Sequence, residues 1–145
     1  MKASTKSRRP LVRAQAKGLA LGSGEAAARV KAGLPVAEFD ALRELLGLTV
    51  DDLAGRVGIS IATLSRRRQG ELPLDPTHGD RLWRLAHLFR LATELYDGDE
   101  AAARAWLMKP ARALDGATPL DHADTEAGAR EVEQLIGRLE HAVYT

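Results

Sequence analysis

Residues 48–68, LTVDDLAGRVGISIATLSRRR, decide the predicted fold, because two short helical patterns meet there at a glycine. Thr49 is a residue type that caps helix N-termini, and Asp51 and Asp52 fall in the first turn, where carboxylates complement the helix dipole. Gly58 stands where a C-cap or a tight turn is expected. These signals predict a first helix between Thr49 and Gly58.

A second helix is predicted over residues 61–68, with Ser60 as its N-cap and Leu64 on its inward face. Two helices that cross steeply need a small residue near the contact, and Ala54 occupies that place. The pair is therefore a predicted helix-turn-helix. In DNA-binding examples the second helix lies in the major groove, where its outward residues meet bases and phosphates. The candidates for DNA contact are Ser60, Ala62, Thr63, Ser65, Arg66 and Arg68.

The same pattern also fits a helical hairpin whose arginine run is solvated. Arg67 stands three residues after Leu64, where such units usually place an apolar residue, so we expect the second helix to pack less deeply or to end early. The coincidence of two caps, a small residue, a glycine and an inward leucine favours DNA contact.

Composition bounds the remaining choices. The chain has 145 residues, 45% of them hydrophobic, which is enough for a packed core, and its six aromatic residues among many Ala, Leu and Arg favour an all-α fold. It has no Cys, and its four His never stand at the i, i+4 spacing of a helical metal site, so we expect no metal and no cofactor. No apolar run reaches membrane-spanning length and the basic N-terminus lacks a signal core, which favours a cytoplasmic location and no membrane partner.

Charge is unevenly distributed, although the net charge is +1. Residues 1–93 carry 16 Lys and Arg against 9 Asp and Glu, whereas residues 94–145 carry 5 against 11. The front part, at +7, suits a phosphate backbone, and the back part, at −6, would be repelled by it. The chain therefore has two predicted tasks, of which the second concerns another partner.

Capping and periodicity extend the all-helical prediction to the rest of the chain. We expect a basic, disordered tail over residues 1–9, and an arm that packs either on its own domain or on a second copy. Gly and Pro predict a loop over residues 69–79, with Asp80 as the cap of the following helix. Trp83, off the apolar stripe of that helix, is either an interface anchor or half-buried against the neighbouring loop. The predicted helices are 11–21, 25–31, 36–46, 81–96, 100–108, 119–123 and a last helix capped by Thr125.

The last helix carries apolar residues at intervals of three and four, from Val132 to Val143. Such a stripe requires a partner surface, either the chain's own core or another protein.

The chain resembles the Xre/MbcA/ParS antitoxins from residue 36 to its C-terminus. The resemblance lies in TLSRRRQGEL at 63–72, in Asp80-Arg81-Leu82, and above all in AWLMKPARALDGATPLDHADTEAGAREVEQLIGRL at 105–139. The most specific positions in the last block are Trp106, Leu107, Pro110, Leu114, Gly116, Pro119, Leu120, Thr125, Gly128, Val132 and Leu135.

The resemblance implies an antitoxin of a bacterial type II toxin-antitoxin pair. Its partner would be a RES-domain toxin that consumes NAD or transfers ADP-ribose, and the antitoxin would cover the toxin's NAD-binding pocket without doing chemistry itself. An Xre- or Cro-like domain would bind operator DNA of its own operon, as a homodimer or a toxin-bridged hetero-oligomer. The implied division is an N-terminal tail and arm (1–33), a helix-turn-helix domain (34–93) and a toxin-binding domain (94–145).

The candidate toxin contacts come from the motif and from the chain end. Most motif residues are expected to shape the turn and core, with some touching the toxin; the candidates are Trp106, Leu107, Pro119, Leu120, His141, Val143 and Tyr144. The alternative function is a stand-alone Xre-type repressor whose C-terminal half dimerises. An enzyme is disfavoured, because the sequence has no paired His, no Gly-rich phosphate loop and no activated nucleophile.

Overall fold

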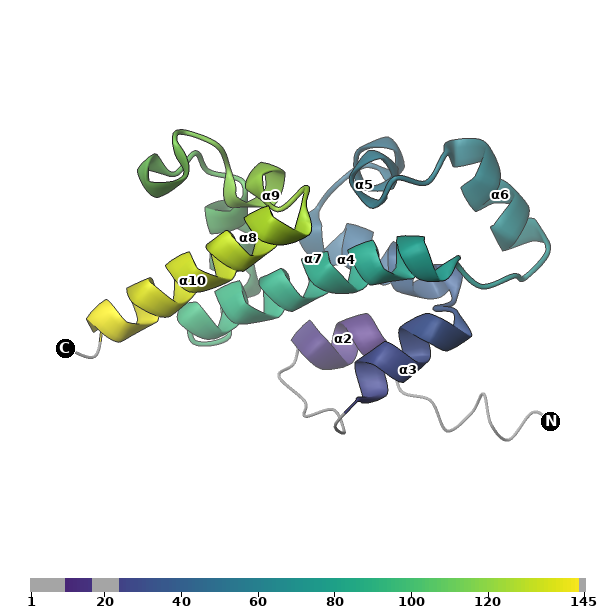
Figure 1. Cartoon of the computed structure of the whole chain (residues 1–145), viewed down its shortest axis with the longest axis horizontal. Coiled ribbons are helices and arrows are strands. Elements are labelled where there is room, and N and C mark those ends of the chain that lie inside the picture. The colour runs from purple at the N-terminus through teal and green to yellow at the C-terminus, as the bar shows by residue number, and fades with distance from the viewer. Residues whose placement is uncertain (1–9, 17–23, 144–145) are drawn as a thin grey trace.

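The computed structural model of the chain describes residues 10–16 and 24–143, and all regular secondary structure in these ranges is helical, as predicted (Figure 1). The helices are α2 (Leu11–Ala16), α3 (Glu25–Ala32), α4 (Val36–Leu46), α5 (Val50–Val57), α6 (Ile61–Gln69), α7 (Pro76–Leu95), α8 (Glu100–Leu107), the short 3-10 helix η1 (Arg112–Leu114), α9 (Pro119–His122) and α10 (Glu126–Val143). The predicted disordered tail over residues 1–9, and residues 17–21 of the predicted first helix, lie outside the described residues.

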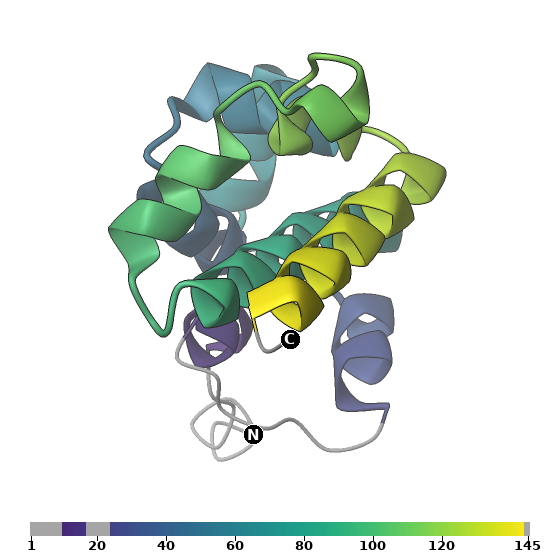
Figure 2. The same cartoon turned by 90° about the vertical axis from the view of Figure 1, so that its left-hand side faces the viewer.

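Helix α7 is the centre of the molecule. It packs against α2, α3, α4 and α5 on the N-terminal side of the sequence, and against α8 and α10 on the C-terminal side (Figures 1 and 2). Its buried residues, Leu82, Leu85 and Phe89 among them, belong to one hydrophobic cluster that extends from Leu11 to Ile136. The N-terminal and C-terminal parts of the chain therefore share one core.

The helix-turn-helix forms as the sequence predicts. Thr49 Oγ1 accepts a hydrogen bond from the Asp52 amide at 3.1 Å, and Ser60 Oγ accepts one from the Thr63 amide at 3.1 Å. Gly58 has a left-handed φ of +83°, and a Cβ there would collide with the guanidinium of Arg81. Glycine is thus required at the turn for its left-handed backbone conformation, whereas the flexible end of the Arg81 side chain can move aside.

The predicted start of α7 at Asp80 is wrong. The helix begins at Pro76, and its N-cap is Asp75, whose Oδ1 accepts from the Thr77 amide at 3.1 Å. Proline interrupts helix interiors but fits the first turn, where its missing N–H leaves no bond unmade. Gly79, read from the sequence as part of a loop, lies buried in the first turn of α7, beside the side chains of Val30 and Leu34.

The N-terminal arm folds back onto its own chain. The buried carboxylate of Glu38 accepts hydrogen bonds from the amides of Leu11 and Val12, at 2.6 and 2.8 Å, and lies 3.6 Å from Arg29. This carboxylate caps the N-terminus of α2. Its two hydrogen bonds and the nearby Arg29 offset part of the free-energy cost of burying its charge. Of the two predicted arrangements for the arm, the structure contains the intramolecular one.

The C-terminal helices begin at the predicted caps. Asp99 Oδ1 accepts from the Ala102 amide, Thr118 Oγ1 from the Asp121 amide and Thr125 Oγ1 from the Gly128 amide, at 3.0–3.1 Å. Helix α10 lies along α7 and buries the first part of its apolar stripe there (Figure 2). The partner surface for Val132, Leu135 and Ile136 is the chain's own core.

Candidate functional site

Helix α6 is the candidate DNA-reading element, and it lies at one edge of the molecule (Figure 1). Leu64 anchors it, with 2% of its surface exposed. Of the predicted DNA-contacting residues, Thr63 is partly exposed and the others are exposed, namely Ser60, Ala62, Ser65, Arg66 and Arg68. The structure thus brings all six to the surface of one short helix and its cap.

The three arginines of α6 differ in how they are held. Arg66 is exposed and donates a hydrogen bond to Thr63 Oγ1 within the same helix, at 3.0 Å. Arg67 donates a hydrogen bond to the carbonyl of Pro73 at 2.9 Å. Arg67 stands where such units usually place an apolar residue, and here it fixes the loop that follows α6. The helix extends to Gln69 and does not end early.

Arg68 pairs with Asp40 of α4 through two hydrogen bonds of 2.8 and 3.0 Å. This bonding raises the pKa of the Arg68 guanidinium above its ordinary value. The charge of Arg68 is paired with a carboxylate, whereas the described contact of Arg66 is a hydrogen bond to an uncharged hydroxyl oxygen. Arg66 is therefore the better placed of the two for a phosphate or a base edge.

The predicted toxin contacts separate into two groups. Leu107 is 0% and Leu120 2% exposed, and Pro119 is buried as well, so these three build the chain's own core and are not available for contact. Trp106 is partly exposed and packs on the edge of the core. Family-motif residues at the C-terminal part therefore mainly maintain the fold.

The end of α10 projects beyond the rest of the molecule (Figure 1). His141 is exposed there and lines a shallow hollow with Gln134, Gly137, Arg138 and Ala142. Val143 is the last residue of the helix, and Tyr144 lies outside the described residues. An exposed His141 near the end of α10 thus lies where toxin contact was expected.

Comparison with known families assigns both parts. Residues 25–87 match the antitoxin Xre-like helix-turn-helix domain, and residues 91–142 match the antitoxin Xre/MbcA/ParS C-terminal toxin-binding domain. A protein named Antitoxin Xre from Photorhabdus laumondii is 34% identical over 111 residues, which is 77% of this chain and 75% of that protein. A second Antitoxin Xre, from Yersinia enterocolitica, is 31% identical over 116 residues, 80% of this chain and 78% of that protein.

The chain belongs to the Xre antitoxin family. Membership in a family of antitoxins places it in a non-enzymatic class, in agreement with the prediction from the sequence. Its two matched regions support a toxin and DNA as partners.

In this Xre antitoxin the two matched regions touch through polar contacts that sequence reasoning missed. Arg56 of α5 bridges Asp52 and Asp121 of α9, at 2.8 and 2.9 Å. Burial lowers the pKa of Arg56, but hydrogen bonds to Asp121 and Asp52 outweigh burial and raise it overall. Arg104 of α8 donates to the carbonyl of Leu45 at 2.8 Å. The two contacts join residues that are separated by 59 and 65 positions in the sequence, so no local sequence pattern predicts them.

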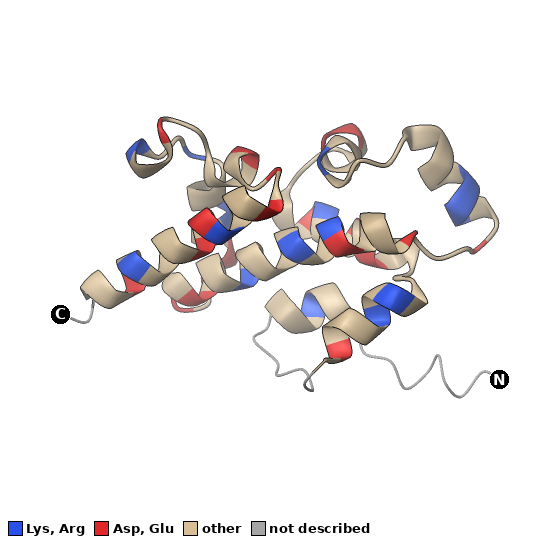
Figure 3. Cartoon of the chain, viewed as in Figure 1, with Lys and Arg blue, Asp and Glu red and all other residues tan. Residues whose placement is uncertain are grey.

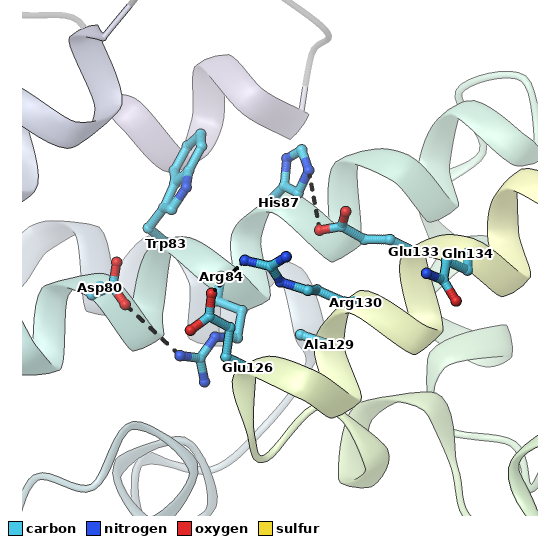
Figure 4. A pocket seen from close by; sticks show the side chains of 9 residues that line it. All are labelled: Asp80, Trp83, Arg84, His87, Glu126, Ala129, Arg130, Glu133 and Gln134. Atoms are coloured by element: carbon cyan, nitrogen blue, oxygen red, sulfur yellow. Dashed lines mark hydrogen bonds and ion pairs between the residues drawn. The ribbon is translucent and has the colours of Figure 1, made fainter.

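A groove between α7 and α10 is lined by charged side chains, among them Asp80, Arg84 and Glu133 (Figure 4). Trp83 is half-buried there, and its ring stacks on His87 with centroids 5.8 Å apart. Burial lowers the pKa of His87, although Glu133, 3.6 Å away across the groove, opposes this. The neutral imidazole is therefore favoured in the folded antitoxin.

Two further observations concern cofactors and membranes. Within residues 10–16 and 24–143, no group of three His, Asp or Glu side chains is arranged to hold a metal ion. Among the helices described, none is both long and apolar enough to cross a bilayer.

Proposed function

We propose that this antitoxin neutralises a RES-domain toxin that consumes NAD, by covering the toxin's active site, and that it binds operator DNA to repress its own operon. The observation that carries the proposal is the presence, on one shared core, of a region matched to toxin-binding domains and a region matched to helix-turn-helix domains. The RES identity of the toxin rests on the resemblance of residues 105–139 to antitoxins of that pair.

Charge supports this division of tasks. Lys and Arg lie on α6 and along α3 and α7, whereas Asp and Glu mark α9, the turn after it and the first part of α10 (Figure 3). The part of the chain with a net charge of −6 begins at residue 94. A duplex would be attracted to the first part and repelled by the second.

For the DNA contact we propose the exposed side of α6, with Ser60, Ala62, Thr63, Ser65, Arg66 and Arg68 closest to the duplex. Reading two half-sites requires two copies, supplied by a homodimer or by a toxin-bridged hetero-oligomer. Arg66→Ala should weaken operator binding about tenfold and reduce the slope of log affinity against log salt by about 1. Arg68→Ala should reduce that slope less, because Asp40 already pairs with it.

For the toxin contact we propose Trp106 and the free end of α10 with His141, Val143 and Tyr144. A truncation after Leu139 tests this, because it keeps the buried residues Val132, Leu135 and Ile136 and removes only residues 140–145. The truncated chain should fold and bind DNA, and should bind the neighbouring RES-domain protein at least about tenfold more weakly. Undiminished toxin binding by the folded truncation would refute the assignment of the chain end.

The stand-alone repressor receives less support. That function needs the C-terminal half as a dimerisation surface, and the stripe proposed for it is already covered by α7. Co-purification with the product of the neighbouring gene distinguishes the two functions.

A further inference from the structure

Ile61 is the first residue of α6, and 45% of its surface is exposed. Single exposed apolar residues are common on protein surfaces and need no explanation by themselves. What distinguishes Ile61 is its position, because the N-terminal residues of a recognition helix are the ones that contact base edges in the major groove.

The polar side chains around Ile61 already have partners. Ser60 Oγ accepts from the Thr63 amide and donates to Thr63 Oγ1 at 2.9 Å. Thr63 Oγ1 also accepts from Arg66 at 3.0 Å. Ser60 thus donates its hydroxyl proton to Thr63, and Thr63 Oγ1 accepts two hydrogen bonds, all within the first turn and its cap.

Two exposed side chains directly after the cap, Ile61 and Ala62, are apolar. Ser65, one turn after Ile61, is small, polar and exposed. Ile61 is the longer of the two apolar side chains, so its methyl groups extend farther from the backbone than the methyl of Ala62. The first turn of α6 therefore presents an apolar surface where base readout takes place.

We propose that Ile61 packs on the C5-methyl group of a thymine in the operator and so selects an A·T pair at one position of each half-site. In the major groove, the thymine methyl is the apolar feature that distinguishes one base pair from the others. This inference rests on the proposed DNA binding and adds to it the chemical group that is read. Arg66 of the same helix would supply the charge-dependent part of the affinity.

The test replaces thymine by deoxyuridine, which lacks only the methyl group. A duplex is first selected from a random library with the full-length chain, and each thymine of the selected site is then replaced in turn. For the unaltered chain, the replacement of one particular thymine in each half-site should weaken binding by about threefold to tenfold. This change is near that expected for losing the burial of one methyl group. For Ile61→Ala, the thymine and deoxyuridine duplexes should bind equally well.

Met108→Ala is the matched control, because Met108 is also an exposed apolar residue, at 37%, and follows α8 on the other side of the molecule (Figure 1). This variant should keep the full thymine preference. The melting temperature of Ile61→Ala should stay close to that of the unaltered chain, since the side chain is exposed.

Three outcomes overturn the proposal. If no thymine in the selected duplex is sensitive to loss of its methyl group, Ile61 reads something else. If Ile61→Ala keeps the sensitivity, another residue makes the contact. If the chain selects no duplex at all, the proposed DNA binding fails together with this inference, whereas the first two outcomes leave DNA binding intact.

Discussion

The helix-turn-helix region and the C-terminal region use their helices in opposite ways. In the first, α6 buries Leu64 and presents its other side outward, so the candidate contact surface is the helix itself. In the second, α10 buries Val132, Leu135 and Ile136 against α7, and its exposed residue His141 lies near its C-terminal end. An apolar stripe thus reports how a helix packs within the chain, and it does not by itself identify a partner.

The two regions are also not independent bodies. They share α7, and the contacts of Arg56 and Arg104 connect them across the fold. We therefore expect one cooperative unfolding transition in which both regions take part.

Leu107→Ala should have the largest effect on stability, because its side chain is 0% exposed. We expect a loss of about 2–5 kcal/mol in the free energy of unfolding, measured by chemical denaturation, with both regions still unfolding together. Met108→Ala, at the adjacent exposed position, should stay within about 0.5 kcal/mol. Two separate transitions in the Leu107 variant would show that the regions fold apart from each other.

Gly128→Ala should destabilise the chain by about 2–3 kcal/mol, because a Cβ there would collide with the backbone carbonyl of His122, which cannot rotate away. Gly137 in the same helix has open space around it, and Gly137→Ala should stabilise the chain by up to about 1 kcal/mol. Thermal melting of the pair measures both effects. Equal melting temperatures for the two variants would contradict the packing of α9 against α10.

The bridge between Arg56 and Asp121 should contribute less. A double-mutant cycle with Arg56→Met and Asp121→Asn is expected to give a coupling energy of about 0.5 kcal/mol, since Asp121 is largely exposed. The coupling should shrink as salt is added. A value of zero at low salt would remove this contact as a link between the regions.

The pH dependence that comes from His87 should be the smallest effect. Because burial lowers the pKa of His87 below 6.5 in the folded state, the unfolded chain binds the proton more readily, and stability should fall as the pH drops through 6.5. His87→Gln should reduce this fall when melting is followed between pH 7.5 and 5.5. An unchanged pH profile would mean that Glu133 and Glu94 offset the burial of His87.

Local signals in the sequence were sufficient for most of the fold. Thr49, Ser60, Asp99 and Thr118 cap helices as predicted, because a cap depends on a few neighbouring residues. The predicted start of α7 at Asp80 was wrong because Asp75, followed by Pro76 at the first helical position, caps the helix instead.

The residues of the candidate site were harder to predict from the sequence. The resemblance marked Trp106, Leu107 and Leu120 without distinguishing core from surface, and only the fold shows which of them is buried. The pairing of Arg68 with Asp40 and the exposure of Ile61 likewise depend on how α6 sits against α4.

We propose that DNA and toxin bind separate surfaces of one fold that shares a single core. The most direct test of this proposal is a gel-shift titration in which the RES-domain protein is added to the antitoxin already bound to its selected duplex. The account predicts a slower-migrating complex that contains duplex, antitoxin and toxin together. Release of free duplex in proportion to the toxin added would contradict it.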